Sequence, residues 1–258
     1  MRVPQSALKP IASYVSDGSF ARYRWARPAK LNDRAAELRD ADLALCQLLE
    51  AGDLASFLSL AVDKRKNIAV VGDTGSGKTT LMKAMCQTIP RHERLITIED
   101  VRELYLPGYA NVVHLLYSKG GQGTANITPS DLISATMRMR PDRVLLAELR
   151  GGEAFDFLKL LTTGHSGSIT SFHAESSALA FERYVFMAKE HKDAGTYDSD
   201  ALKRLITLTI DCVIHVVARI EEVEGEMRKV RFVDEVHFDP VAKLESQVGD
   251  GHVVSARG

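Results

Sequence analysis

Short apolar runs alternate with helix-like stretches through the middle of the chain. The runs NIAVV (67–71), LITIE (95–99), VVHLLY (112–117), RVLLAE (143–148) and GSITSF (167–172) are predicted to be strands. Helical spacing of apolar residues predicts helices at about 78–87, 129–139 and 152–161. Strands that are apolar on both faces are typical of a sheet covered by helices on both sides. The pattern therefore predicts an α/β fold with a mostly parallel sheet.

The two ends of the chain show other patterns. Residues 41–62 predict two helices, with Asp53 as the cap of the second, and residues 177–189 and 200–210 predict two more. CVIHVVARI and MRKVRFVDEV, separated by a charged turn, predict a β-hairpin. We therefore expect a linker with helices over 1–62, the main α/β domain over 63–240 and a loose tail over 241–258.

Basic and aromatic residues alternate in the linker, where Arg22, Arg24 and Arg27 surround Tyr23 and Trp25. Such a strip can stack bases and neutralise phosphates. Alternatively, the aromatic rings pack on a neighbouring element while the arginines stay in solvent. The sequence favours the second interpretation and leaves the first open.

Composition narrows the class of protein. With 33 Lys and Arg against 34 Asp and Glu, the net charge is −1, so nucleic-acid contact would need a local patch and is not supported by net charge. The cysteines Cys46, Cys86 and Cys212 are scattered, which argues against disulfides and against a four-cysteine zinc site. We expect Cys46 and Cys86 to be small buried groups.

Targeting signals are not evident in the sequence. The start, MRVPQSALKP, lacks the apolar segment of a signal peptide, and no run approaches the ~18 apolar residues of a membrane span. The expected location is the cytoplasm.

One glycine-rich motif has a specific chemical meaning. Residues 72–79, GDTGSGKT, fit G-x-x-x-x-G-K-[ST] and lie between a predicted strand and a predicted helix. In such a loop, glycines let backbone N–H groups approach phosphate, the helix N-terminus attracts anions, and the lysine reaches the terminal phosphates. We therefore expect ATP to bind at Thr74, Gly75, Ser76, Gly77, Lys78, Thr79 and Thr80, with the Thr79 hydroxyl on Mg²⁺.

Hydrolysis also requires a carboxylate that supports the metal and positions water. Glu148 follows a buried strand, at the end where α/β sheets bind ligands. We expect it to support Mg²⁺ and polarise the attacking water. A second acidic group, Glu99, Asp100 and Glu103, follows the LITIE strand at the same edge, with solvated loop acids as the alternative.

Two histidines flank the predicted strand at 167–172. His173 can hydrogen-bond a phosphate or respond to its loss, and a structural role is equally compatible with its spacing. Metal binding by His165 and His173 is less favoured because no cysteine or third histidine is nearby in sequence.

Four motifs in this order resemble the type II/type IV secretion ATPase superfamily. They are GDTGSGKTT, LITIEDVREL, MRMRPDRVLLAELRGGEA and TGHSGSITSFHA, which match the Walker A, Asp, Walker B and His boxes of that family. The similarity is greatest to the VirB-type traffic ATPases of type IV secretion systems, densely over 67–240 and loosely before that.

The resemblance implies a RecA-like P-loop fold and a Mg-dependent ATPase that works as a homohexameric ring at the cytoplasmic side of a bacterial inner membrane, with other secretion components. Carried onto this sequence, it gives Lys78 and Thr79 to phosphate and Mg²⁺, Glu148 to the Walker B role, and His173 to the His box. Glu99 and Glu103 take the water-positioning role of the Asp box. Arg140 and Arg150 bracket the Walker B strand and are candidates for charge compensation, with pairing to the acids around them as the alternative.

The sequence also differs from the family pattern. Family members carry an N-terminal domain that closes over the nucleotide, and RVPQS resembles only its end. We therefore expect site closure and ring assembly by this chain alone to be weak. A type II secretion or type IV pilus motor is one alternative, and a non-catalytic, nucleotide-gated interaction domain is another.

Overall fold

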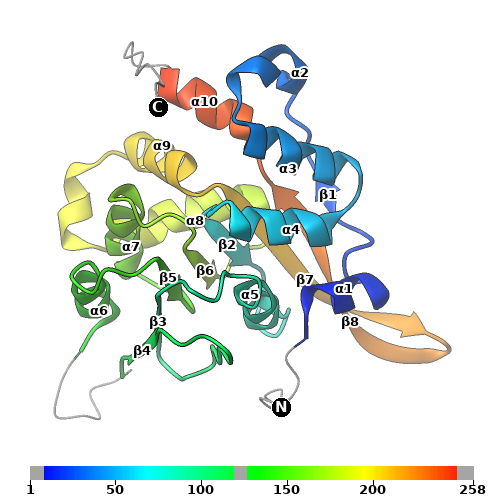
Figure 1. The fold of residues 1–258 in the computed structure, drawn as a ribbon, viewed down its shortest axis with the longest axis horizontal. Coiled ribbons are helices and arrows are strands. Elements are labelled where there is room, and N and C mark those ends of the chain that lie inside the picture. The colour runs from blue at the N-terminus through cyan, green and yellow to red at the C-terminus, as the bar shows by residue number, and fades with distance from the viewer. Residues whose placement is uncertain (1–8, 119–126, 249–258) are drawn as a thin grey trace.

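The computed structural model describes residues 9–118 and 127–248, and within them one sheet forms the centre of the molecule (Figure 1). Its strand order is β1-β8-β7-β2-β6-β5-β3-β4, and every neighbouring pair is parallel except the antiparallel pair β7 and β8. The strands are β1 (Arg24–Trp25), β2 (Ile68–Val71), β3 (Leu95–Glu99), β4 (Val112–Leu116), β5 (Arg143–Leu146), β6 (Ile169–Phe172), β7 (Cys212–Val223) and β8 (Glu226–His237). The predicted mostly parallel α/β sheet is confirmed.

Helices cover both faces of this sheet. They are α1 (Ile11–Ser16), α2 (Leu31–Arg34), α3 (Asp40–Glu50), α4 (Leu54–Asp63), α5 (Lys78–Cys86), α6 (Pro129–Thr136), α7 (Glu153–Thr162), α8 (Ser177–Lys189), α9 (Ser199–Thr209) and α10 (Pro240–Val248), with short 3₁₀ turns at Ala35–Glu37 and Lys192–Thr196. One hydrophobic core joins the sheet to α1, α3, α4 and α5, and a second joins it to α6, α7, α8 and α9.

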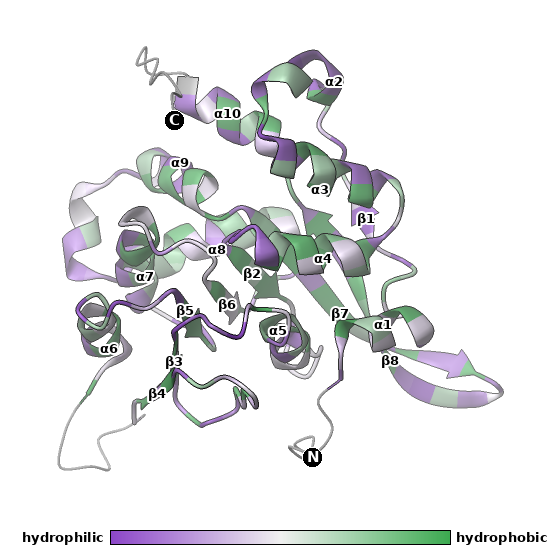
Figure 2. Ribbon diagram, viewed as in Figure 1, coloured by the Kyte–Doolittle hydropathy of each residue, from purple (hydrophilic) through white to green (hydrophobic). Residues whose placement is uncertain are grey.

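The strand β2 shows why the short apolar runs become strands. Ile68 and Val70 pack in the first core, whereas Ala69 and Val71 pack in the second, because side chains alternate between the faces of a strand. All four residues are buried. Figure 2 shows the same pattern, with hydrophobic strands at the centre and hydrophilic positions at the outer part of the β7–β8 hairpin.

The linker packs on the sheet as a short edge strand. Trp25 donates its indole N–H to the carbonyl oxygen of Phe238 at 3.0 Å, and Tyr23 donates its hydroxyl to the carbonyl oxygen of Leu49 at 3.1 Å. The arginines of this segment pair with carboxylates, as in Arg24 with Asp234 at 2.8 Å. These contacts support packing rather than a nucleic-acid strip.

The C-terminal part differs from the sequence prediction. The expected loose tail over 241–258 is wrong for its first part, because α10 continues to Val248, and residues 249–258 lie outside the described part of the chain. The carboxylate of Asp239 accepts a hydrogen bond from the N–H of Ala242 at 2.8 Å, and Val241 is buried. Asp-Pro at a helix start is a recognisable cap signal, so this helix was predictable. The division into linker and domain stays a prediction.

The predictions for Asp53, Cys46 and Cys86 are confirmed. Asp53 caps α4 by accepting a hydrogen bond from the N–H of Ser56 at 3.0 Å. The thiols of Cys46 and Cys86 are buried and unbonded, and burial raises the pKa of each to about 12. Among the described residues, no helix combines the length and the apolar character needed to cross a bilayer.

Candidate active site

The phosphate-binding motif forms a tight loop between β2 and the N-terminus of α5. Gly72, Gly75 and Gly77 have φ values of 146°, 74° and 103°. At Gly72 a Cβ atom would lie 2.0 Å from the carbonyl oxygen of Val216, so only glycine fits there. No side chain caps the first turn of α5, and its free N–H groups make the loop an anion-binding site.

The side chain of Lys78 forms hydrogen bonds with the backbone of this loop. Its Nζ atom donates to the carbonyl oxygens of Gly72 at 2.7 Å and Asp73 at 2.9 Å. Burial lowers the pKa of Lys78, while the nearby carboxylates of Glu148 and Asp73 oppose that shift. The ammonium group is therefore placed at the loop, where a phosphate oxygen can replace the backbone oxygens that it bonds.

A cavity of about 850 Å³ opens beside the loop. The predicted phosphate-binding residues Gly75, Ser76, Gly77, Lys78, Thr79 and Thr80 all line it, whereas Thr74 lies exposed on the loop outside it. The hydroxyl of Ser76 is buried and makes no hydrogen bond within the described residues. A buried orphan hydroxyl and uncapped N–H groups fit a bound anion.

Glu148 lies just beyond β5 and contacts two predicted site residues. Its Oε1 atom lies 3.0 Å from Nε2 of His173, and its Oε2 atom accepts a hydrogen bond from Nε of Arg150 at 2.9 Å. His173 also reaches Lys78, with 3.4 Å between Nδ1 and Nζ. Burial raises the pKa of Glu148, and the charges of His173 and Lys78 act against that rise. The histidine thus joins the Walker B acid to the phosphate-loop lysine.

The acids after β3 are arranged differently from the expectation. Glu99 is fully buried and accepts hydrogen bonds from the N–H groups of Glu103 at 2.9 Å and Leu104 at 2.7 Å, and from the Thr97 hydroxyl at 3.1 Å. These contacts hold the loop after β3 and give Glu99 a structural role, and its role toward water stays a prediction. Glu103 lines the cavity beside the phosphate loop.

Asp100, another member of the acidic group after β3, interacts with the side chains around Glu148. Its Oδ2 atom lies 3.3 Å from Nη1 of Arg150, and its charge contributes to the raised pKa of Glu148. The side chain beyond a strand end turns to one face or the other, and sequence spacing does not say which. The acidic group was therefore visible in the sequence, but its member nearest Glu148 was not.

The two candidate arginines lie at opposite ends of β5 in the structure. Arg150 lies at the carboxyl end of β5 and pairs with Glu148 and Asp100, which agrees with the alternative that it pairs with the acids around it. Arg140 is exposed and precedes β5, at the end of the strand opposite Glu148, and the structure does not bring it to the site. His165, which precedes β6, is at that opposite end too.

Comparison with known proteins places this site in a family. The sequence model of the family described as "Type II/IV secretion system protein" matches residues 31–249. The type IV secretion system protein VirB11 of Brucella suis is 41% identical over 245 residues, which cover 94% of this chain and 64% of that relative. PtlH of Bordetella pertussis, also a type IV secretion system protein, is 47% identical over 175 residues, covering 67% of this chain and 51% of PtlH.

A solved structure agrees with these sequence relatives. The VirB11 ATPase from the Brucella suis type IV secretion system, solved in complex with sulphate, has a TM-score of 0.75 and 40% identity, over 95% of this chain and 67% of that one. The chain thus spans about two thirds of the length of VirB11. The family model covers most of the chain, and its relatives agree in sequence and in structure, so the chain belongs to the type II/IV secretion system protein family.

Proposed function

We propose that this protein hydrolyses ATP in a Mg²⁺-dependent reaction and that hydrolysis powers a type IV secretion system, in pilus assembly and in export of protein or DNA substrates. The observation that carries the proposal is the linkage of Lys78, His173 and Glu148, with 3.4 Å and 3.0 Å between successive partners. It unites a phosphate ligand and a candidate base at the carboxyl edge of a parallel sheet.

The residues present fit Mg-ATP. The cavity is large enough for a nucleotide, and the orphan hydroxyl of Ser76 and the uncapped start of α5 supply donors for phosphate. Among the described residues, no cluster of three or more His, Cys, Asp or Glu is arranged to hold a metal ion. Mg²⁺ suits such a site because it is bound through few protein ligands plus phosphate and water, here the Thr79 hydroxyl and Glu148. When bound, it neutralises charge on the phosphates.

The remaining roles follow from the contacts. Lys78 binds phosphate, and Glu148 orients water and accepts its proton as a general base. His173 holds the carboxylate of Glu148 in place and keeps it close to Lys78. Arg150 pairs with Glu148 and Asp100, which fixes the acidic side of the site.

Two alternatives are weaker. A type II secretion or pilus motor would share this fold, but the relatives at 41% and 47% identity are type IV secretion proteins. A non-catalytic interaction domain would have no use for a half-buried carboxylate linked through one histidine to the phosphate-loop lysine.

The proposed assembly is a homohexameric ring at the cytoplasmic side of the bacterial inner membrane, together with other secretion components. Membership of the family and the names of the relatives support this proposal. In such a ring the exposed Arg140 is available to a neighbouring copy.

The test is ATP binding measured beside phosphate release for the wild type, Lys78→Ala and Glu148→Gln. We expect Lys78→Ala to lose binding and Glu148→Gln to keep binding but lose turnover. A wild-type chain that binds no ATP would overturn the proposal. The mass of the protein in solution, with and without nucleotide, tests the ring separately.

A further inference from the structure

The β7–β8 hairpin presents two cations on one face. Ala218 is paired with Arg231, and Ile220 with Lys229, so these side chains point to the same side of the ribbon. β8 carries an extra residue, Asp234, opposite the step from His215 to Val216. This bulge determines which residues of β8 before it point to which side of the sheet.

The bulge directs that face toward the phosphate loop. Val216 and Val233, the buried pair next to the bulge, lie in the same core as Leu81 of α5. Arg231 and Lys229 precede Val233 by two and four residues, so they point to the same side of the sheet as α5. The strand pairing and the burial of Val233 therefore both place the two cations on the side of the sheet that faces α5.

Both cations stand directly over the glycine loop. The Nε atom of Arg231 donates a hydrogen bond to the carbonyl oxygen of Gly75 at 3.0 Å. The Nζ atom of Lys229 lies 3.4 Å from the position that a Cβ atom on Gly75 would occupy. The side chains of Lys229 and Arg231 line the same 850 Å³ cavity as Lys78 and Thr79.

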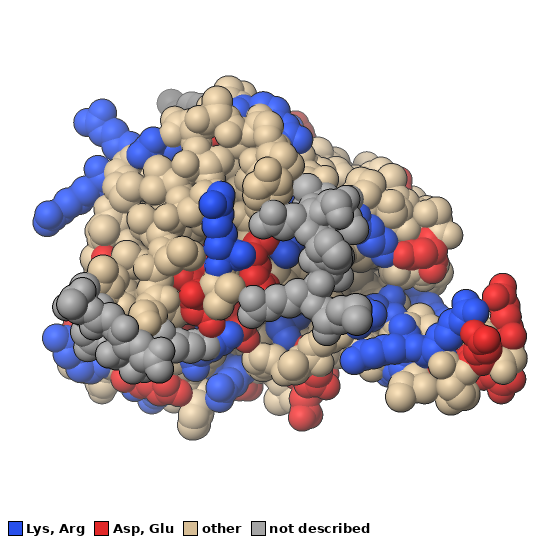
Figure 3. Space-filling model, turned by 90° about the horizontal axis from the view of Figure 1, so that it is seen from below, with Lys and Arg blue, Asp and Glu red and all other residues tan. Residues whose placement is uncertain are grey.

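Among the described residues, no acid forms an ion pair with the two cations of this face, although Asp17 and Glu103 line the same cavity. On the opposite face, Arg228 pairs with Glu226 at 2.8 Å and Glu221 pairs with Arg22 at 2.8 Å. Lys229 and Arg231 make no ion pair with any Asp or Glu that the structure describes. Figure 3, seen from below, shows Lys and Arg side chains along the protruding hairpin at the right and acidic side chains at its far end.

A nucleoside triphosphate carries more negative charge than one lysine and one Mg²⁺ neutralise. Two exposed cations beside a phosphate loop, one of them bonded only to a loop carbonyl, are placed to supply the rest. We propose that Lys229 and Arg231 are polyphosphate-binding residues of the nucleotide site, and that Arg231 exchanges the carbonyl oxygen of Gly75 for a phosphate oxygen. This inference rests on the proposed function.

Binding assays on three variants test the inference. Lys229→Gln and Arg231→Gln remove cations of the loop-facing side, and Arg228→Gln removes the neighbouring cation of the other face. Affinities for Mg-ATP, ADP and inorganic tripolyphosphate are measured by calorimetry at several salt concentrations. We expect Arg231→Gln to weaken binding of all three by about tenfold or more, as for loss of a charge-assisted hydrogen bond. Lys229→Gln should weaken binding less and lower its salt dependence, and Arg228→Gln should bind like wild type.

The outcomes separate this inference from the proposed function. If the wild type binds Mg-ATP and Lys78→Ala does not, but both loop-facing variants match Arg228→Gln, the hairpin inference is wrong and the proposed function stands. If the wild type binds no nucleotide, the proposed function itself fails. Arg231→Lys keeps the charge and should retain most of the affinity. Equal losses in Arg231→Lys and Arg231→Gln, with normal unfolding curves, would contradict charge neutralisation.

Discussion

The Nε2 atom of His173 lies 3.0 Å from the Oε1 atom of Glu148. Through its other ring nitrogen the same imidazole lies 3.4 Å from the Nζ atom of Lys78. One side chain therefore links the proposed base to the proposed phosphate ligand, and removing it should change both the orientation and the acidity of Glu148.

Glu148→Gln should separate binding from turnover. The amide keeps the size of the side chain but cannot accept a proton from water, so phosphate release should fall by roughly 10²-fold or more. ATP affinity should change by no more than about twofold, measured by calorimetry. Glu175→Gln, an exposed carboxylate two residues after His173, is the control and should keep wild-type turnover. Undiminished turnover in Glu148→Gln would remove the acid from the mechanism.

As the pH is lowered, the rate of ATP hydrolysis should begin to fall at a higher pH than it would if Glu148 had the pKa of an ordinary glutamate. Burial raises the pKa of Glu148 above its usual value, so the carboxylate is protonated, and lost as a base, at a less acidic pH. His173→Gln removes the imidazole whose interaction with the carboxylate lowers this pKa, and the acidic limb should then move to still higher pH. Profiles of kcat/KM against pH for both proteins check the direction. An acidic limb that moved to lower pH in His173→Gln would contradict the assignment.

Glu99→Gln should lower the stability of the folded protein. The buried carboxylate accepts hydrogen bonds from two backbone N–H groups and a hydroxyl, and the amide cannot replace them all. We expect a loss of about 1–3 kcal/mol in the free energy of unfolding. The half-exposed Glu103, replaced by Gln, should lose less than about 0.5 kcal/mol. Urea titration of both variants tells these cases apart, and equal stabilities would show that Glu99 does not hold the loop.

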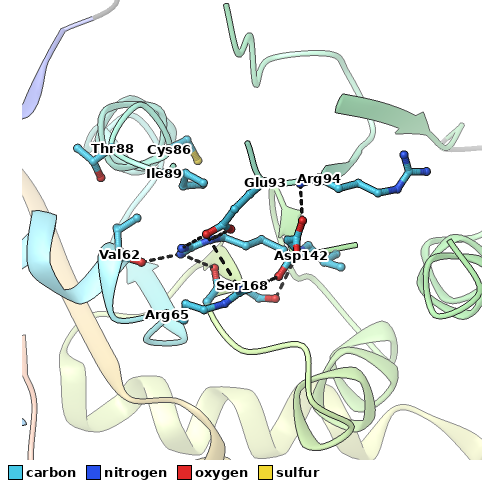
Figure 4. Close-up of polar contacts among 12 residues, drawn as sticks. Val62, Arg65, Cys86, Thr88, Ile89, Glu93, Arg94, Asp142 and Ser168 are labelled. Carbon is cyan, nitrogen blue, oxygen red and sulfur yellow. Dashed lines mark hydrogen bonds and ion pairs between the residues drawn. The ribbon is translucent and has the colours of Figure 1, made fainter. Parts of the chain in front are cut away.

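A buried ion pair lies at the sheet edge opposite the proposed site. Arg143 is fully buried and bonds Glu93 through Nη2 at 3.0 Å and the carbonyl oxygen of Val62 at 2.7 Å. In Figure 4, Glu93, Val62 and Asp142 come together there from separate segments.

Arg143→Met should therefore cost about 3 kcal/mol of unfolding free energy, because it leaves the buried carboxylate of Glu93 with only the more distant Arg65, at 3.9 Å. The double variant Arg143→Met/Glu93→Leu should lose less than the sum of the single variants. Denaturant titration of the three proteins measures this coupling. Strict additivity would show that Arg143 and Glu93 do not depend on each other.

Much of the fold follows from local sequence. The apolar runs gave the strands β2 and β3, and the cap at Asp53 placed the start of α4, because burial and capping are recorded in neighbouring residues. The strand β1 could not be predicted this way. Its residues, Arg24 and Trp25, are extended because they pair with Glu235 and Val236, more than 200 positions away in the chain.

In the site, too, some features follow from local sequence and others depend on long-range contacts. GDTGSGKT defines its own loop, so Lys78 and Thr79 could be placed from sequence. The choice between Glu99 and Asp100 depends on how the chain turns beyond β3. The approach of Lys229 and Arg231 depends on a bulge and on a long-range pairing. Only the alternation of cations in Lys229-Val230-Arg231 pointed to a shared face.

The length of the hairpin has a mechanical consequence. β7 pairs with β2 only over Cys212–His215, so the paired ribbon from Val216 to Val223 extends past the sheet by roughly 26 Å, at ~3.3 Å per residue. Lys229 and Arg231 lie between its tip and its base. The hydrogen bond from Arg231 to Gly75 therefore connects the phosphate loop directly to a ribbon whose tip lies well outside the sheet.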